Sequence, residues 1–123
     1  MLGRYTMHRG KRPAGDPLPA GARQDTRKHT RHVLRPTAEL VQAYLGAPGD
    51  AAWEAFRRAY LELLAARFAE DPAPFEALAE LAGKGDVWLG CSCPTRKNPD
   101  PSRCHTVLAL GFMAERFPGL ELA

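Results

Sequence analysis

Three cysteines and one histidine are the residues of this chain whose types and spacing are best suited to chemistry. Cys91, Cys93 and Cys104 fall within fourteen positions, and His105 follows directly. Thiolates and imidazoles act as nucleophiles, as acid–base groups and as zinc ligands. An odd number of cysteines leaves one thiol over from any disulfide pairing. We therefore expect free thiols that belong to one site.

The elements that must position these residues are a strand, a loop and a helix. An apolar run over residues 86–93, bounded by glycine and proline, is typical of a buried strand. Cys91 and Cys93 have the same parity at its end, so their side chains should leave the strand on one face. A polar, proline-containing loop follows, and Ser102 is suited to cap a helix over residues 103–117.

Cys104 and His105 then occupy the second and third positions of that helix. Unpaired backbone N–H groups and the positive end of the helix dipole favour an anion there. The same field lowers the pKa of a cysteine thiol. We therefore predict that Cys104 is alkylated first, that Cys93 is intermediate, and that Cys91, inside the apolar strand, is slow.

Three interpretations of this group remain open. In the first, the strand end and helix start form a pocket for a phosphate or another oxyanion, with Cys104 and His105 as its catalytic groups. The residues assigned to ligand binding in that pocket are Cys91, Cys93, Ser102, Arg103 and Arg96. In the second, the three thiolates and the imidazole bind zinc, although Cys-x-Cys departs from the usual Cys-x2-4-Cys spacing. In the third, the cysteines are small buried apolar groups without a chemical role.

Length and composition favour one small α/β domain over residues 1–123. The hydrophobic share of 45% and charged share of 25% exclude collagen-like and wholly disordered chains. The longest uncharged apolar stretch, residues 106–114, has nine residues, whereas a membrane span needs roughly 18. The N-terminus lacks the layout of a secretory signal, so the cytoplasm is the expected compartment.

Hydrophobic periodicity predicts three helices before the cysteine group. The first begins near Thr37 and ends at Leu45, the second is capped by Asp50, and the third covers residues 73–82. The apolar face of the second contains Trp53, Phe56, Tyr60, Leu64 and Phe68, and the third should bury Phe75, Leu78 and Leu81. With a first strand over residues 2–7, these elements indicate a small, mostly parallel sheet. The strand over residues 86–93 should lie near its centre, with helices on the sheet's faces.

A basic segment over residues 8–32 suggests a second class of function. Residues 1–35 contain nine Lys or Arg against two Asp, a net of +7, and the remainder contains eight against twelve, a net of −4. The segment has almost no large apolar residue, so we expect a loop that builds no core and orders on a partner. Basic side chains neutralise phosphates, which favours a nucleic-acid-associated protein as the alternative function. Its contact residues would be Arg23, Arg27, Lys28 and Arg31.

The C-terminal two thirds of the chain resemble a known family. The pieces that carry the resemblance are Trp-Glu-Ala-Phe-Arg-Arg-Ala-Tyr at 53–60, Gly-Asp-Val-Trp-Leu-Gly-Cys at 85–91, and Cys-His-x-x-Leu from Cys104. Over about residues 50–117 these pieces resemble the DUF488 family of small bacterial proteins, and the cysteine motifs equally resemble the DUF4326 domain. The resemblance implies an α/β domain with the Cys-His element at the carboxyl edge of the sheet, where such folds place ligands. The family has no assigned reaction, so the resemblance does not change the expected ligand. Under the oxyanion-pocket interpretation, that ligand is a small phosphorylated molecule or nucleotide, and no cofactor is expected.

Overall fold

A parallel three-stranded sheet in the order β1–β3–β2 organises the computed structural model, which describes residues 1–123. The elements in chain order are β1 (Leu2–Thr6), β2 (Ala22–Asp25), α1 (Ala38–Gly46), α2 (Asp50–Glu70), α3 (Ala73–Lys84), β3 (Val87–Cys91) and α4 (His105–Arg116). The predicted α/β class and the central place of the third strand are both confirmed. No helix combines the length and the apolar composition that crossing a membrane requires.

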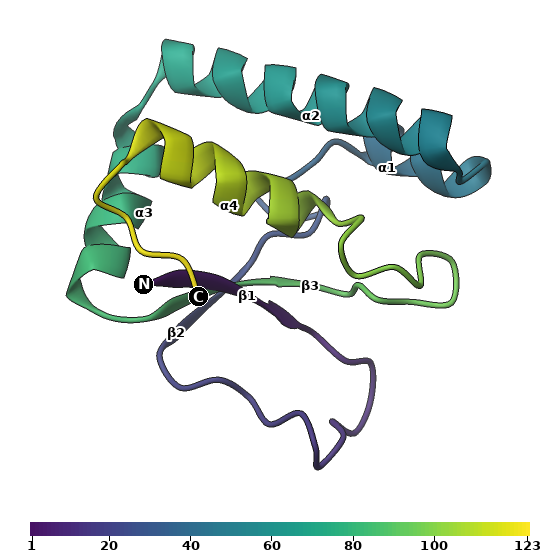
Figure 1. Ribbon diagram of the computed structural model, residues 1–123, viewed down its shortest axis with the longest axis horizontal. Helices are drawn as coiled ribbons and strands as arrows, with labels where there is room; N and C mark the ends of the chain where they lie inside the picture. Colours follow the sequence, from purple (N-terminus) through teal and green to yellow (C-terminus); the bar gives the residue numbers. More distant parts are fainter.

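The helices and the long first loop lie on opposite sides of this sheet. Figure 1 shows α4 directly over one face, α2 over α4, and the loop between β1 and β2 on the other side. Val87 and Leu89 of β3 face the helices and belong to the hydrophobic core. Trp88 and Gly90 alternate with them and face the loop, because side chains of a strand point to opposite faces in turn. The loop, rather than a second helical layer, therefore covers the other face.

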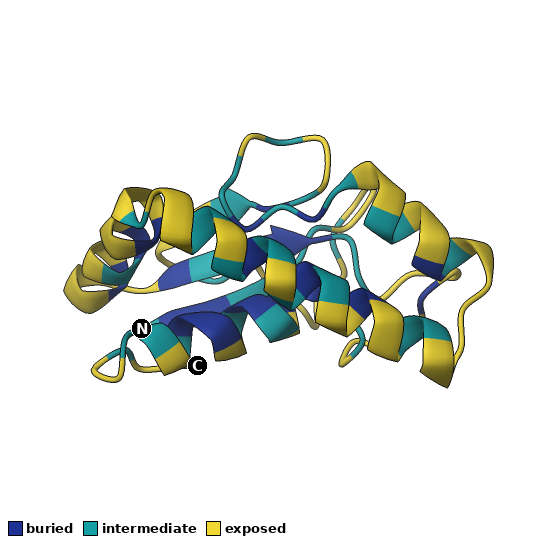
Figure 2. Ribbon diagram, turned by 90° about the horizontal axis from the view of Figure 1, so that it is seen from above, coloured by how far each residue is buried: buried dark blue, intermediate teal, exposed yellow.

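The core forms where α2, α3 and α4 turn their apolar faces toward the sheet. Phe56, Tyr60 and Leu64 of α2 are buried at a spacing of four, and Figure 2 shows the outward side of the helices exposed. In α3 the buried residues are Phe75, Leu78 and Ala82. Leu81 is 41% exposed, so its predicted inward orientation is wrong. The buried face continues four residues after Leu78, at Ala82, which turns Leu81 to the solvent.

The basic segment over residues 8–32 contributes more structure than predicted. Ala22–Asp25 form the edge strand β2, which pairs in parallel with β3, and Thr26 directly after it is fully buried. The expectation of a loop without core contacts is therefore wrong for this part. A polar edge strand is held by backbone hydrogen bonds, and a search for apolar periodicity does not detect those bonds.

Gly21 sets the entry into β2, and its replacement should be costly. Its φ of +119° is unfavourable for residues with a Cβ, and an added Cβ would lie 2.5 Å from the Asp86 carbonyl oxygen. Gly21→Ala should therefore lower the free energy of unfolding by about 2 kcal/mol in urea denaturation. Gly15 lies in the same loop, and an added Cβ there meets no atom within 4 Å. Gly15→Ala is the control, and equal stability of the two variants would contradict the strained geometry.

Candidate functional site

A cavity of about 330 Å³ lies at the carboxyl ends of β2 and β3. The cysteine and histidine residues that line it from the end of β3 to the start of α4, here called the floor, are Cys91, Cys93, Cys104 and His105. One side, the aromatic wall, consists of Tyr44, Trp53 and Phe56. The basic rim consists of Arg27, Lys28, His29 and Arg103. The predicted Cys-His element thus lies at the carboxyl edge of the sheet, beside the basic segment.

The three cysteines form one thiol cluster (Cys91, Cys93 and Cys104). Cys91 ends β3, Cys104 directly precedes α4, and Cys93 lies in the connection between them. Their Sγ atoms all lie within 4.8 Å of one another, and the Sγ atoms of Cys91 and Cys104 are 2.8 Å apart. No disulfide joins them. The expectation that the cysteines share one site is confirmed.

Each sulfur of the thiol cluster accepts a hydrogen bond from a donor outside the cluster. Arg4 Nη2 donates to Cys91 Sγ at 3.4 Å, and Asn98 Nδ2 donates to Cys93 Sγ at 3.3 Å. The hydroxyl of Thr106 donates to Cys104 Sγ at 3.1 Å and accepts from Arg4 Nε at 2.9 Å. The environment therefore favours sulfurs that carry negative charge.

Sequence reasoning missed all three of these donors. Arg4 had a usable signal, because it lies two residues after the core residue Leu2 in β1 and so faces the same side. Asn98 is buried within a loop whose composition is polar throughout, and it ties that loop to the helix start by donating to the Arg103 carbonyl at 2.7 Å. Its role depends on the loop conformation, for which the sequence has no periodic signal.

The cysteine with the lowered pKa is Cys91, which corrects the prediction for Cys104. The hydrogen bond from the Cys104 thiol lowers the pKa of Cys91 far below its ordinary value, and Arg4 adds to this effect. The same bond raises the pKa of Cys104, because a second thiolate beside the first is disfavoured. Both side chains are buried, whereas Cys93 is partly exposed.

The helix position assumed for Cys104 is also wrong. Helix α4 begins at His105, and Cys104 is its N-cap residue, without a side-chain capping bond. Ser102 does not cap the helix, because its backbone N–H and hydroxyl both donate to Asp100 Oδ1, at 2.9 and 2.6 Å. Asp50 shows the same kind of shift, since it is the first residue of α2 and Gly49 precedes it as N-cap.

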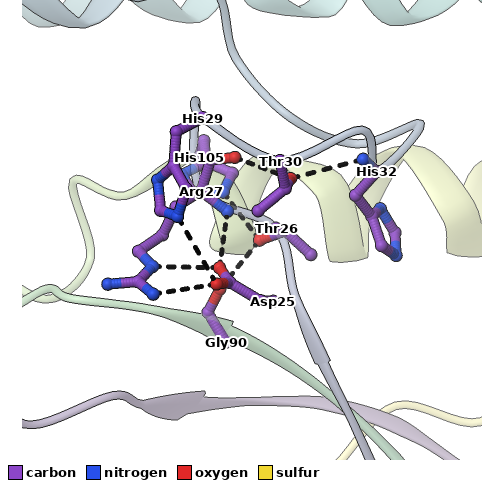
Figure 3. A network of polar contacts seen from close by, with 8 residues as sticks. All are labelled: Asp25, Thr26, Arg27, His29, Thr30, His32, Gly90 and His105. Atoms are coloured by element: carbon purple, nitrogen blue, oxygen red, sulfur yellow. Dashed lines mark hydrogen bonds and ion pairs between the residues drawn. The ribbon is translucent and has the colours of Figure 1, made fainter.

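His105 is held as a neutral side chain under the cavity. The Thr26 hydroxyl donates to the Gly90 carbonyl at 3.0 Å, so it accepts from His105 Nε2, which lies 2.8 Å away (Figure 3). This arrangement leaves Nδ1 unprotonated. Burial lowers the pKa of His105, in agreement with the neutral form. His105 Nδ1 lies 3.8 Å from Cys104 Sγ, but it is not within 4.8 Å of all three sulfurs.

The basic rim holds both neutralised and free charges. Arg27 Nη2 lies 2.8 Å from Asp25 Oδ2, and His29 Nε2 lies 3.9 Å from the same oxygen (Figure 3). The bond from Arg27 lowers the pKa of Asp25. Arg103 pairs with Asp50. Lys28 is exposed and forms no ion pair, so it is the uncompensated cation of the rim.

Four other predicted site residues lie outside the residues that line the cavity. Arg96 is exposed in the loop after β3, and Ser102 is turned toward Asp100. Of the four residues considered for nucleic acid, Arg27 and Lys28 are at the rim. Arg23 and Arg31 are exposed elsewhere, and Arg23 donates to the Pro19 carbonyl.

Comparison with known proteins agrees with the DUF488 resemblance over about residues 50–117 and extends it toward the N-terminus. The family model DUF488-N3a, described as the active DUF488-N3 subclade, matches residues 14–117. This range includes β2, the aromatic wall and the whole thiol cluster. No curated protein and no solved structure is significantly similar to the chain. With the family model covering more than half of its length, the chain belongs to the DUF488 family.

Proposed function

We propose that the cavity binds a small phosphorylated molecule with an aromatic ring, of which a nucleotide is the typical example. The observation that carries the proposal is that one cavity combines an aromatic wall with a basic rim. Ligand sites are mostly apolar, with a few polar groups that orient the ligand. α/β folds place such sites at the carboxyl ends of their strands. The described cavity fits both generalisations.

The aromatic wall is suited to a planar ring. Trp53 and Phe56 stack at 5.5 Å between ring centroids with 17° between their planes, and Tyr44 meets Trp53 edge-on at 5.7 Å. Trp53 is only partly buried, so part of its ring is accessible from the cavity. A base that packs against this ring would bury apolar surface and add an aromatic contact.

Lys28 is the best candidate on the rim for a phosphate. Arg27 and Arg103 are engaged by carboxylates, whereas the ammonium of Lys28 has no such partner. A phosphate held beside it would gain a charge-assisted hydrogen bond. The candidates for a chemical step on the bound molecule are Cys104 and His105, which line the floor below. The description of the matched subclade as active supports such a step.

Tryptophan fluorescence provides a direct test, because the chain has two tryptophans on opposite sides of the sheet. Trp88 faces the first loop, so Trp88→Phe leaves Trp53 as the single reporter. In this background, adenosine or uridine monophosphate should quench the fluorescence in a saturable way. Lys28→Ala should weaken binding about tenfold, the loss of one charged hydrogen bond. Lys84→Ala is the matched control and should leave binding unchanged, because Lys84 lies on α3 and pairs with Glu80.

Two outcomes would contradict the proposal. One is the absence of saturable quenching by either nucleotide, and the other is an equal effect of Lys28→Ala and Lys84→Ala. A single-stranded oligonucleotide is titrated in parallel at several salt concentrations. Binding of the oligonucleotide alone, with a steep salt dependence that Arg23→Ala and Arg31→Ala reduce, would favour the nucleic-acid-associated function instead.

A further inference from the structure

We propose that the thiol cluster is a mononuclear zinc site. Cys91, Cys93 and Cys104 would bind one Zn²⁺ through their Sγ atoms and leave its fourth position directed into the cavity. This inference goes beyond the proposed nucleotide binding, and its test uses metal alone.

The distances within the thiol cluster suit a single ion. Zn–S bonds of about 2.3 Å in a tetrahedron place two sulfurs about 3.8 Å apart. The observed Sγ separations begin at 2.8 Å between Cys91 and Cys104 and do not exceed 4.8 Å, so they bracket this value. Sulfurs that bind separate irons of a cluster lie farther apart, so the geometry favours one ion.

The hydrogen bonds around the sulfurs are a second, independent observation. Arg4, Asn98 and Thr106 each donate to a different sulfur of the cluster. Metal-bound ligands are regularly oriented by such outer hydrogen bonds, and these donors match thiolates better than neutral thiols. Three thiols that served only for packing would not need one donor each.

The local charges balance when zinc is bound. Three thiolates and one Zn²⁺ carry a net charge of −1, and the guanidinium of Arg4 beside Cys91 supplies +1. Zinc binding would displace the remaining thiol protons into the solvent, which is the usual coupling of metal binding to ionisation. Without the ion, the cluster can hold only part of this negative charge, because thiolates in contact repel one another.

The fourth position should be open rather than filled by His105. Its Nε2 is engaged by Thr26, and its Nδ1 lies 3.8 Å from Cys104 Sγ without being within 4.8 Å of all three sulfurs. All three cysteines line the cavity, so an exchangeable ligand can approach the ion from that side. Three protein ligands with an open fourth position are characteristic of catalytic rather than structural zinc sites. A water or an oxyanion of the cavity ligand is the chemical class expected there.

The test measures metal in the full chain, purified with a reductant and without chelators. Elemental analysis should find about one zinc per chain, and Co²⁺ should replace it with thiolate-to-cobalt charge-transfer bands and tetrahedral d–d bands. Serine at any one of the three cysteines should abolish these bands. His105→Gln should keep one equivalent of metal and the same bands. Thr106→Val should weaken Co²⁺ binding about 10- to 100-fold, the usual loss for an outer hydrogen-bond partner.

Several results would overturn the zinc site or its open fourth position. The proposal fails if the reduced protein binds neither zinc nor Co²⁺. It also fails if a disulfide between Cys91 and Cys104 persists in the reductant. Loss of the cobalt bands in His105→Gln would show that the imidazole of His105 is the fourth ligand and that the site has no open position. Circular dichroism of each variant identifies those that fail to fold. Since Thr106→Val removes no ligand, unchanged Co²⁺ affinity in this variant when folded would also contradict the proposed hydrogen-bonded site.

Discussion

Phe75→Ala should lower the free energy of unfolding by about 4 kcal/mol, the largest stability effect that we predict. Phe75 is fully buried on the inner face of α3. Its ring meets Phe68 edge-on at 5.3 Å between centroids and Phe112 at 5.7 Å. The substitution leaves a cavity where α2, α3 and α4 meet, and close-packed aromatic neighbours refill such a space only in part.

Leu81→Ala is the matched control on the same helix. The simple periodicity of the sequence places Leu81 and Phe75 on one buried face, whereas the structure leaves Leu81 41% exposed. We expect a loss below about 1 kcal/mol, because little apolar area returns to water. Urea denaturation of both variants measures the difference. Similar losses at the two positions would show that α3 is rotated relative to the described packing.

The helices and the central strand were predictable because the spacing of their apolar residues in the sequence reflects which faces are buried. The apolar positions of α2 repeat at helical spacing. Thr37, near which the first helix was predicted to begin, is its N-cap residue, and its side chain accepts a hydrogen bond from the Leu40 N–H. The run that became β3 is apolar because a central strand is covered on both faces. Strand β2 lacks such a pattern, since its partner is the backbone of β3 and its side chains are polar.

The candidate site was predictable only where its residues are close in sequence. The three cysteines lie within fourteen positions of one strand–loop–helix unit, so strand parity placed Cys91 and Cys93 on one face and the short separation placed Cys104 near them. Trp53 and Phe56 of the aromatic wall were predicted as core residues, yet Trp53 is partly buried and lines the cavity. Arg4 joins the site through the parallel register in which Arg4 pairs with Leu89 and Thr6 with Cys91. Such a register between distant segments depends on the tertiary fold rather than on local spacing.

Arg4→Met should lower the free energy of unfolding by about 3 kcal/mol, because it removes the guanidinium beside Cys91, whose lowered pKa favours a thiolate. Arg4 Nη2 also donates to the Cys93 carbonyl at 2.9 Å, in addition to its bonds to Cys91 Sγ and the Thr106 hydroxyl. Methionine retains the apolar stem, so the loss reports the guanidinium rather than the packing. The Cys93 carbonyl keeps the bond from the Thr6 hydroxyl at 2.8 Å, which limits the number of groups left unpaired.

Two further substitutions separate the charge of Arg4 from its geometry. Arg9→Met, at an exposed position in the first loop, should change stability by less than about 0.5 kcal/mol. Arg4→Lys keeps the positive charge but cannot donate to three acceptors from one planar group, so its stability should lie between those of wild type and Arg4→Met. Urea denaturation of the chelator-treated, reduced chain measures all three without a contribution from bound metal. A loss in Arg4→Met no larger than that in Arg9→Met would mean that the sulfur of Cys91 is uncharged, because a neutral thiol does not require a buried guanidinium beside it.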